Sequence, residues 1–189
     1  MKKVIFLDRD GVINRDSRHY VKSWEEFEFL PGSLSAIRRL NAKGHVVIII
    51  TNQSAVNRRI IPIEVLQDIH LKLKQSVTSN GGKITDIFFC PHRPDEHCSC
   101  RKPKPGLILQ ALKKYSIDRA STTMVGDSPK DIECAANAGC RYRVLVKSGI
   151  RDDAERVLAA RKIYPDFIAG DLSAAADWIM DRYGDTENS

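Results

Sequence analysis

Long hydrophobic runs are missing from this 189-residue sequence. The longest purely aliphatic run covers residues 46–50, far short of the roughly 20 apolar residues that a membrane-spanning helix needs. The opening Met1, Lys2 and Lys3 lead into a short apolar run and then into charge, without the length or the cleavage site of a signal peptide. We therefore expect no membrane partner and a cytoplasmic location.

Aromatic residues are also scarce, at 7% of the chain. This scarcity argues against a basic-aromatic platform for single-stranded nucleic acid. The 30 Lys and Arg outnumber the 24 Asp and Glu, for a net charge of +6, but no basic run reaches five residues. A solvated surface explains scattered cations better than a nucleic-acid-binding face does. Nucleic acid is therefore not the expected partner.

The remaining composition is that of a globular protein. Hydrophobic residues make up 42% and charged residues 29% of the chain, which excludes a disordered or fibrous protein. The length fits one domain over residues 1–189, and no repeat or low-complexity linker divides it. Since no exposed apolar stripe stands out, we expect a monomer.

Short apolar runs alternate with segments of helical periodicity along the whole chain. This alternation predicts an α/β fold, with a Rossmann-like parallel sheet and helices on both faces. Ligands bind such sheets at the carboxyl ends of the strands. The predicted strands are residues 4–7, 46–50, 84–90, 122–125 and 144–146, and the predicted helices are residues 33–43, 63–77, 107–115, 129–138, 153–162 and 173–182.

The first predicted strand ends in Asp8, Arg9, Asp10 and Gly11. Two carboxylates two residues apart can converge on one cation, one through its side chain and one through a backbone carbonyl. A carboxylate can also attack phosphorus if a divalent cation offsets the charge repulsion. The alternative, an Asx-type turn with a permissive glycine, is equally consistent with this segment alone.

Polar donors follow the second predicted strand and precede the third predicted helix. Residues 51–54, Thr-Asn-Gln-Ser, could donate hydrogen bonds to a phosphoryl group, although a polar turn explains them as well. Residues 101–106, Arg-Lys-Pro-Lys-Pro-Gly, place cations beside prolines. Prolines hold such cations more rigidly than an open helix face. A surface loop with solvated charges is the alternative.

The fourth predicted strand ends near Asp127, which can complete a magnesium site with Asp8 and Asp10. Magnesium prefers hard oxygen ligands and keeps several waters. Ser128 is suited to cap the following helix, with Pro129 at its first position. Asp131 then fits a capping box, and a role behind the metal ligands is the alternative.

A second metal site is indicated by cysteine and histidine residues at 90–100. Cys90, His92, Cys98 and Cys100 supply four ligands of the kind that a closed tetrahedral zinc site uses. On extended backbone, side chains two residues apart point to the same side, so Cys90 can face the same way as His92, and Cys98 the same way as Cys100. A free-thiol loop is the alternative. The cluster directly precedes Arg101, so we expect zinc to fix the loop that carries the cations.

Together and in this order, the motifs resemble those of the haloacid dehalogenase superfamily of phosphatases. The resemblance covers about the first 131 residues and implies a magnesium-dependent phosphomonoester hydrolase. In this family's mechanism, Asp8 would form an aspartyl phosphate and Asp10 would act as general acid and then as general base. Thr51 and Lys102 would stabilise phosphoryl oxygens. Magnesium would be held by Asp8, the Asp10 carbonyl and Asp127.

The cysteine cluster followed by Arg-Lys-Pro is similar to the subgroup of heptose bisphosphate phosphatases and histidinol-phosphatases. The segment around residues 14–32 favours the heptose enzymes, which remove the 7-phosphate of D-glycero-D-manno-heptose 1,7-bisphosphate for lipopolysaccharide precursors. Histidinol-phosphatase and DNA 3′-phosphatase are the alternatives. Residues 55–61 depart from the subgroup's pattern, and there is no room for a cap domain. Further substrate contacts implied by the resemblance are Asp16, Tyr20, Asn52, Gln53, Ser54 and Arg101.

Overall fold

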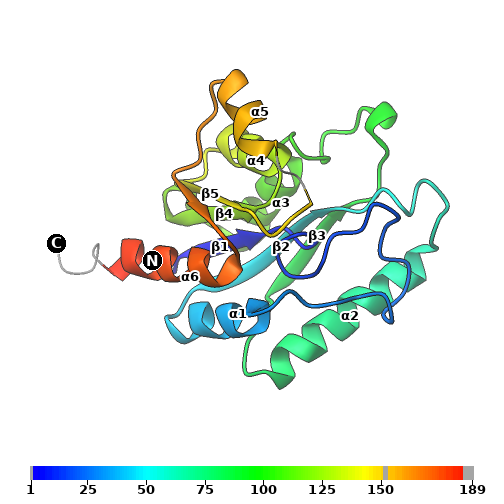
Figure 1. The fold of residues 1–189 in the computed structure, drawn as a ribbon, viewed down its shortest axis with the longest axis horizontal. Helices are drawn as coiled ribbons and strands as arrows, with labels where there is room; N and C mark the ends of the chain where they lie inside the picture. Colours follow the sequence, from blue (N-terminus) through cyan, green and yellow to red (C-terminus); the bar gives the residue numbers. More distant parts are fainter. Residues whose placement is uncertain (1, 151–152, 185–189) are drawn as a thin grey trace.

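The computed structural model describes residues 2–150 and 153–184. Six parallel strands form one sheet in the order β3-β2-β1-β4-β5-β6 (Figure 1). This confirms the predicted parallel α/β sheet. The segment that begins with Asp8 directly follows a central strand, β1. The strands are β1 (Val4–Leu7), β2 (Val46–Asn52), β3 (Asp86–Cys90), β4 (Thr122–Gly126), β5 (Tyr142–Val146) and β6 (Phe167–Ala169).

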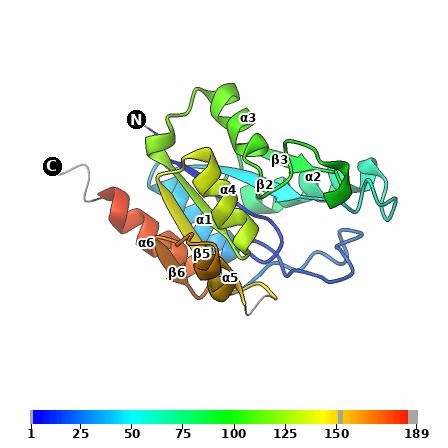
Figure 2. The ribbon, with the colours of Figure 1, turned by 90° about the horizontal axis from the view of Figure 1, so that it is seen from above.

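Helices cover both faces of the sheet, as predicted (Figures 1 and 2). The core on one face gathers apolar side chains from α1, α2 and α6. The opposite face is covered by α3, α4 and α5. The helices are α1 (Ser33–Ala42), α2 (Ile63–Ser79), α3 (Gly106–Tyr115), α4 (Pro129–Ala138), α5 (Ala154–Ala160) and α6 (Leu172–Gly184).

The central strands are apolar on both sides because both faces are covered. In β1, Ile5 and Leu7 point into the core with α1, α2 and α6, whereas Val4 and Phe6 point into the core with α3 and α4. All four side chains are almost fully buried. Successive residues of a strand face opposite sides, so a continuous apolar run is what a doubly covered strand requires.

Helix α4 has the ends that its sequence predicts. Ser128 and Asp131 form a capping box at its start, Pro129 takes the first helical position, and Gly139 ends the helix in a left-handed conformation.

The strand β6 was not predicted, because it is only three residues long. A segment that short has no readable periodicity, and it is defined by pairing with β5.

The strand order places the ends of β1 and β4 side by side. Leu7 pairs with Val125, and the backbone N–H of Asp8 donates to the Val125 carbonyl at 3.0 Å. The chain leaves β1 towards β2 on one side and leaves β4 towards β5 on the other, which opens a crevice between the ends of β1 and β4.

Among the described residues, no helix is both long and apolar enough to cross a membrane.

Candidate active site

A cavity of about 460 Å³ lies at the carboxyl ends of the central strands. The loops after β1, β2 and β4 and the loop before α3 line it. Every sequence-predicted site residue outside the cysteine cluster lines this one cavity. These residues are Asp8, Asp10, Asp16, Tyr20, Thr51, Asn52, Gln53, Ser54, Arg101, Lys102 and Asp127.

Asp8 follows β1 directly and lies at the floor of the cavity. Its Oδ1 accepts a hydrogen bond from the Arg9 backbone N–H at 2.7 Å and lies 2.9 Å from the Lys102 ammonium. Burial raises the pKa of Asp8 to about 7, with the negative charge of Asp131 adding to the effect and Lys102 opposing it. The carboxylate is therefore poorly solvated and held by one cation, as a nucleophile requires.

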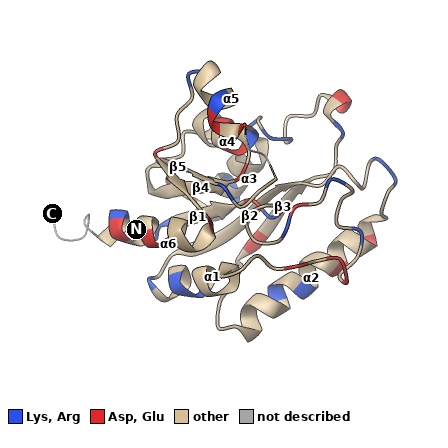
Figure 3. Cartoon of the chain, viewed as in Figure 1, with Lys and Arg blue, Asp and Glu red and all other residues tan. Residues whose placement is uncertain are grey.

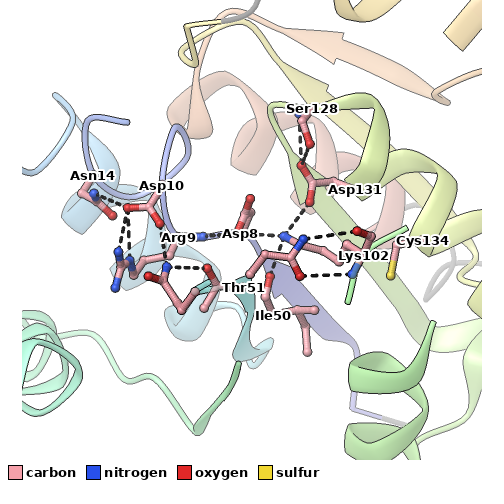
Figure 4. A network of polar contacts seen from close by, with 12 residues as sticks. Asp8, Arg9, Asp10, Asn14, Ile50, Thr51, Lys102, Ser128, Asp131 and Cys134 are labelled. Carbon is pink, nitrogen blue, oxygen red and sulfur yellow. Dashed lines mark hydrogen bonds and ion pairs between the residues drawn. The ribbon is translucent and has the colours of Figure 1, made fainter. Parts of the chain in front are cut away.

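Asp10 is held by donors on both of its carboxylate oxygens (Figure 4). Oδ1 accepts from the Arg9 guanidinium at 2.9 and 3.2 Å and from the Asn14 amide at 2.9 Å. Oδ2 accepts from the Gln53 amide at 2.7 Å. Burial opposes the charged form, but Arg9 and these hydrogen bonds outweigh it and lower the pKa of Asp10.

Thr51 lies at the end of β2 and is almost fully buried. Its hydroxyl accepts from the Gln53 amide at 3.0 Å, so the Gln53 side chain bridges Thr51 and Asp10. The hydroxyl proton of Thr51 remains available for an acceptor in the cavity. The end of β2 therefore fixes the Thr51 hydroxyl and the Gln53 amide side by side on one wall of the cavity.

Lys102 is buried, and its ammonium has three oxygen partners (Figure 4). It lies 2.9 Å from Asp8 and 2.6 Å from Asp131 and donates to the Ile50 carbonyl at 2.9 Å. Burial opposes the charge, but the two carboxylates outweigh it and raise the pKa of this amine. Lys102 is thus a fixed cation beside Asp8.

The backbone around Lys102 is fixed from the neighbouring strand. The Asn52 side chain donates to the Lys102 carbonyl at 3.2 Å and accepts from its N–H at 3.1 Å. Arg101 donates to the His92 carbonyl at 3.1 Å. Asn52 and Arg101 therefore tie the cation loop to β2 and to the cysteine cluster, although both also line the cavity.

Asp127 follows β4 and faces Asp8 across the crevice. Carboxylate oxygens of Asp8, Asp127 and Asp131 all lie within 4.8 Å of one another. Burial raises the pKa of Asp127 to about 9, helped by the charges of Asp131 and Asp8. A side chain at Gly11 or Gly149 would overlap Asp127, at 2.4 and 1.9 Å from its Oδ2. The loops therefore pack tightly around a set of hard oxygen donors that fits Mg²⁺.

Asp131 fulfils the predicted capping role and also contacts the active-site cation. Its Oδ2 accepts from the backbone N–H of Ser128 at 3.0 Å and from the Ser128 hydroxyl at 2.6 Å. Its Oδ1 lies 2.6 Å from the Lys102 ammonium. Both oxygens thus have protein partners, which places Asp131 behind Lys102 and beside the metal-binding oxygens.

The cysteine cluster lies beside the cavity, at the end of β3. The sulfur of Cys90 is 3.1 Å from that of Cys100 and 3.6 Å from that of Cys98, and His92 Nδ1 is 3.3 Å from the Cys100 sulfur. A tetrahedral site with Zn–S bonds of about 2.3 Å has ligand atoms roughly 3.5–4 Å apart. The four ligand atoms lie within 4.8 Å of one another, so the set fits zinc.

Three further predicted residues border the outer part of the cavity. Asp16 accepts from the backbone N–H of Ser17 at 2.7 Å. Tyr20 has a positive φ of 62° and packs against a small apolar cluster from the loop after β2. Ser54 is buried at the start of that loop.

Several charged residues at the cavity were not singled out from the sequence. Arg58, Lys130 and Arg161 line it from three separate segments, and Arg9 lies in its wall. Both basic and acidic segments lie on the loops beyond the strand ends (Figure 3). Sequence spacing carries no signal for Arg58 and Arg161, because only the fold brings them to the cavity, whereas Lys130 lies three residues after Asp127. For Arg9 the signal was its place between two aspartates.

Comparisons with known proteins show which families the chain is similar to. Residues 99–175 match a family model described as HAD-hydrolase-like. The chain is 42% identical over 174 residues to the D-glycero-beta-D-manno-heptose-1,7-bisphosphate 7-phosphatase of Pseudomonas putida, covering 92% of this chain and 97% of that protein. It is 43% identical to the enzyme of the same name from Pseudomonas aeruginosa, covering 95% of this chain and 98% of that protein.

Solved structures show the same similarity. The crystal structure of D,D-heptose 1,7-bisphosphate phosphatase from B. bronchiseptica, complexed with magnesium and phosphate, superposes with a TM-score of 0.87. The two sequences are 40% identical, and the match covers 95% of this chain and 99% of that one. The similarity therefore extends over most of the fold.

Proposed function

The chain belongs to the family of D-glycero-β-D-manno-heptose-1,7-bisphosphate 7-phosphatases among the HAD-like hydrolases, and we propose that it removes the 7-phosphate of this sugar bisphosphate. The observation that carries the proposal is the placement of Asp8, a buried carboxylate 2.9 Å from the Lys102 ammonium, with Asp127 across the same crevice. A nucleophile, a fixed cation and a metal-binding oxygen are what phosphoryl transfer to an aspartate needs.

In the first step, the Asp8 carboxylate attacks phosphorus in line with the leaving oxygen. The bond between phosphorus and the sugar oxygen breaks, and Asp10 donates a proton to that oxygen, so the sugar leaves as an alcohol. Lys102 and the Thr51 hydroxyl face the phosphoryl oxygens and offset their charge. The product on the protein is an aspartyl phosphate.

In the second step, a water attacks the phosphorus of the aspartyl phosphate. Asp10, now a carboxylate, accepts a proton from this water, the bond between Asp8 and phosphorus breaks, and inorganic phosphate leaves. Mg²⁺ bound by Asp8, the Asp10 carbonyl and Asp127 would supply the positive charge that lets an anionic nucleophile approach a phosphate. Asp131 holds Lys102 in place through both steps.

For the cysteine cluster we propose structural zinc. The support is the ligand set, Cys90, His92, Cys98 and Cys100, whose atoms gather within 4.8 Å. Arg101, the neighbour of Lys102 in the chain, links the loop to this cluster by donating to the His92 carbonyl. The metal would therefore fix the loop carrying Lys102 and take no part in the chemistry.

We further propose a monomer that acts in the cytoplasm on a small phosphorylated sugar. Exposed large apolar side chains of the described residues lie on separate elements, for example Leu71 on α2, Leu109 on α3 and Ile168 on β6. Scattered apolar residues of this kind do not form a stable dimer interface. Light scattering coupled to gel filtration tests this directly.

The test of the activity is phosphate release with Mg²⁺ from both anomers of heptose 1,7-bisphosphate, compared with histidinol phosphate and a 3′-phosphorylated oligonucleotide. We expect the β-anomer to be the best substrate and Asp8→Asn to abolish release. Asp166→Asn, which alters an acidic residue paired with Arg143 away from the cavity, is the matched control. Preferred turnover of histidinol phosphate or of the oligonucleotide would refute the substrate assignment.

A further inference from the structure

Arg9 is a buried cation that the proposed chemistry does not use. Its side chain is only 1% exposed, yet it lies between the two aspartates of the motif. Burying a guanidinium is costly unless its N–H groups find acceptors. Two of its nitrogens, Nε and Nη2, donate to Asp10 at 3.2 and 2.9 Å. The cation is also 5.9 Å from the centre of the Phe27 ring.

The third nitrogen of Arg9 contacts a histidine from a distant part of the chain. Nη1 lies 3.4 Å from Nε2 of His70, which is on the inner face of α2. A guanidinium has only donors, so Nε2 must be the accepting nitrogen and the ring proton lies on Nδ1. His70 is 8% exposed and packs edge-on against the Phe89 ring. Burial and the Arg9 charge lower the pKa of His70 to about 3, so the ring stays neutral.

The two oxygens of Asp10 consequently have unequal surroundings. Oδ1 accepts three N–H donors, two from Arg9 and one from Asn14. Oδ2 accepts one, from Gln53. A carboxylate oxygen that already accepts three donors has no lone pair left for a proton. The proton of the neutral acid therefore resides on Oδ2.

From this geometry we propose that Arg9 and His70 are positioning residues: His70 holds the Arg9 guanidinium against Oδ1 of Asp10, so that Oδ2 alone delivers the proton to the leaving oxygen. The inference rests on the proposed function, because it assumes that Asp10 is the general acid. It adds a residue from α2 to a site otherwise built from strand-end loops.

The chemistry supplies a readout that a purely structural role would not change. A sugar alkoxide is a poor leaving group and needs the proton from Asp10, whereas p-nitrophenolate leaves without one. A displaced Asp10 therefore slows release of the sugar more than release of p-nitrophenolate. Loss of folded protein lowers both rates equally. The ratio of kcat/KM for the two substrates isolates the positioning effect, since kcat/KM covers the steps up to release of the alcohol.

The experiment measures this ratio with Mg²⁺ for the wild type and for Asp10→Asn, His70→Ala and His70→Gln. Since general acid catalysis contributes about 10²–10⁴-fold, we expect Asp10→Asn to lose that much on the heptose bisphosphate and far less on p-nitrophenyl phosphate. For His70→Ala we expect a loss of about tenfold confined to the heptose bisphosphate. His70→Gln, whose amide oxygen can accept from Arg9, should restore most of it.

A matched control is available in His45, an equally buried histidine beside Tyr183 on α6. His45→Ala should leave the ratio unchanged. Equal losses on both substrates for His70→Ala, or no loss, would overturn the inference while leaving the proposed function intact. If Asp10→Asn itself shows no dependence on the leaving group, the assignment of Asp10 as general acid fails, and the inference fails with it.

Discussion

Asp8 and Asp127 are carboxyl groups that share a buried site. Burial raises the pKa of Asp8 to about 7 and that of Asp127 to about 9, and neighbouring negative charges add to both shifts. Metal ligands must be deprotonated before they bind a cation. Below these pKa values, Mg²⁺ therefore has to displace protons. We predict that the affinity for Mg²⁺ rises between pH 6 and pH 9, by up to about tenfold per pH unit for each proton displaced.

Isothermal titration calorimetry in buffers of different ionisation enthalpy measures both the affinity and the number of protons released. The Asp127→Asn variant should bind Mg²⁺ more weakly and release fewer protons than the wild type. Asp166→Asn, at a surface ion pair away from the cavity, should match the wild type. A Mg²⁺ affinity that does not change with pH would contradict the prediction.

His70 gives the free energy of unfolding a pH dependence of its own. Its pKa is about 3 in the folded protein, against 6.5 for an ordinary histidine, because burial and the charge of Arg9 disfavour the imidazolium. Unfolding below pH 6.5 therefore takes up a proton, and stability falls as the pH is lowered from about 6.5 towards 3. We predict that the wild type loses about 1.4 kcal/mol per pH unit more than His70→Gln within this window.

Urea denaturation between pH 6.5 and pH 5 tests this difference in slope. His19→Gln, which removes an exposed histidine, should keep the slope of the wild type. Parallel curves for the wild type and His70→Gln would show that the buried ring is charged in the folded state.

Sequence reasoning predicted residues that line the cavity but not the histidine that contacts Arg9. Asp8, Asp10 and Asp127 were identifiable because their segments follow predicted strands in the order that the family's motifs take. His70 was not identifiable, because a histidine on the buried face of an amphipathic helix has the spacing of an ordinary core residue. Its role depends on Arg9, which lies 61 residues earlier in the chain, and such a pairing appears only once the fold is known.

At the scale of elements, the loop after β3 connects the cysteine cluster to the active site. Lys104 donates to the Cys98 carbonyl at 2.7 Å, and Arg101 donates to the His92 carbonyl. The loop also lies so close to the start of α3 that a side chain at Gly106 would come within 2.4 Å of the Ser99 carbonyl oxygen. We therefore expect a displacement of the cluster to displace Lys102 as well.

We predict that Cys98→Ala loses the bound metal and lowers kcat by about 10–100-fold, because a shift of about 1 Å at a catalytic cation has an effect of that size. Metal content by mass spectrometry and phosphate release test the two parts. Cys140→Ala, a cysteine outside the cluster, is the matched control. A variant that lost its zinc and kept the wild-type kcat would show that the loop needs no metal.

Apart from β6, the strands and α-helices were predictable, and the differences lie at their ends. The second strand continues two residues beyond its aliphatic run, to Asn52, because residues Thr51 and Asn52 pair with β3. The third strand begins at Asp86, two residues after the start of the predicted strand at residue 84, because pairing with β2 starts there. Hydrophobic periodicity reports burial, whereas the length of a strand is set by its partner.

At the scale of the whole molecule, the described residues form one sheet with apolar cores on both faces, between the sheet and its helices. Leu73 of α2 is fully buried in the core that also contains α1 and α6, away from the cavity. Leu→Ala substitutions at such sites cost about 2–5 kcal/mol. We predict that Leu73→Ala lowers the free energy of unfolding by that amount and leaves kcat/KM of the folded protein unchanged.

Chemical denaturation measures the first quantity, and phosphate release at a temperature where the variant is folded measures the second. Leu71→Ala, on the exposed side of the same helix, should change neither. A drop in kcat/KM for Leu73→Ala would mean that α2 transmits packing changes to the site through His70.

The central position of β1 has a further consequence for partial opening of the molecule. The amide of Asp8 is bonded to β4, and β1 is paired on both sides, so exposing this amide to solvent requires the sheet to separate. Its hydrogen exchange should therefore proceed only through global unfolding. The edge strand β3 and the loop after it can open locally at lower cost. We therefore expect the nucleophile to be the last part of the site to be lost under stress, after the edge of the sheet at β3 has opened.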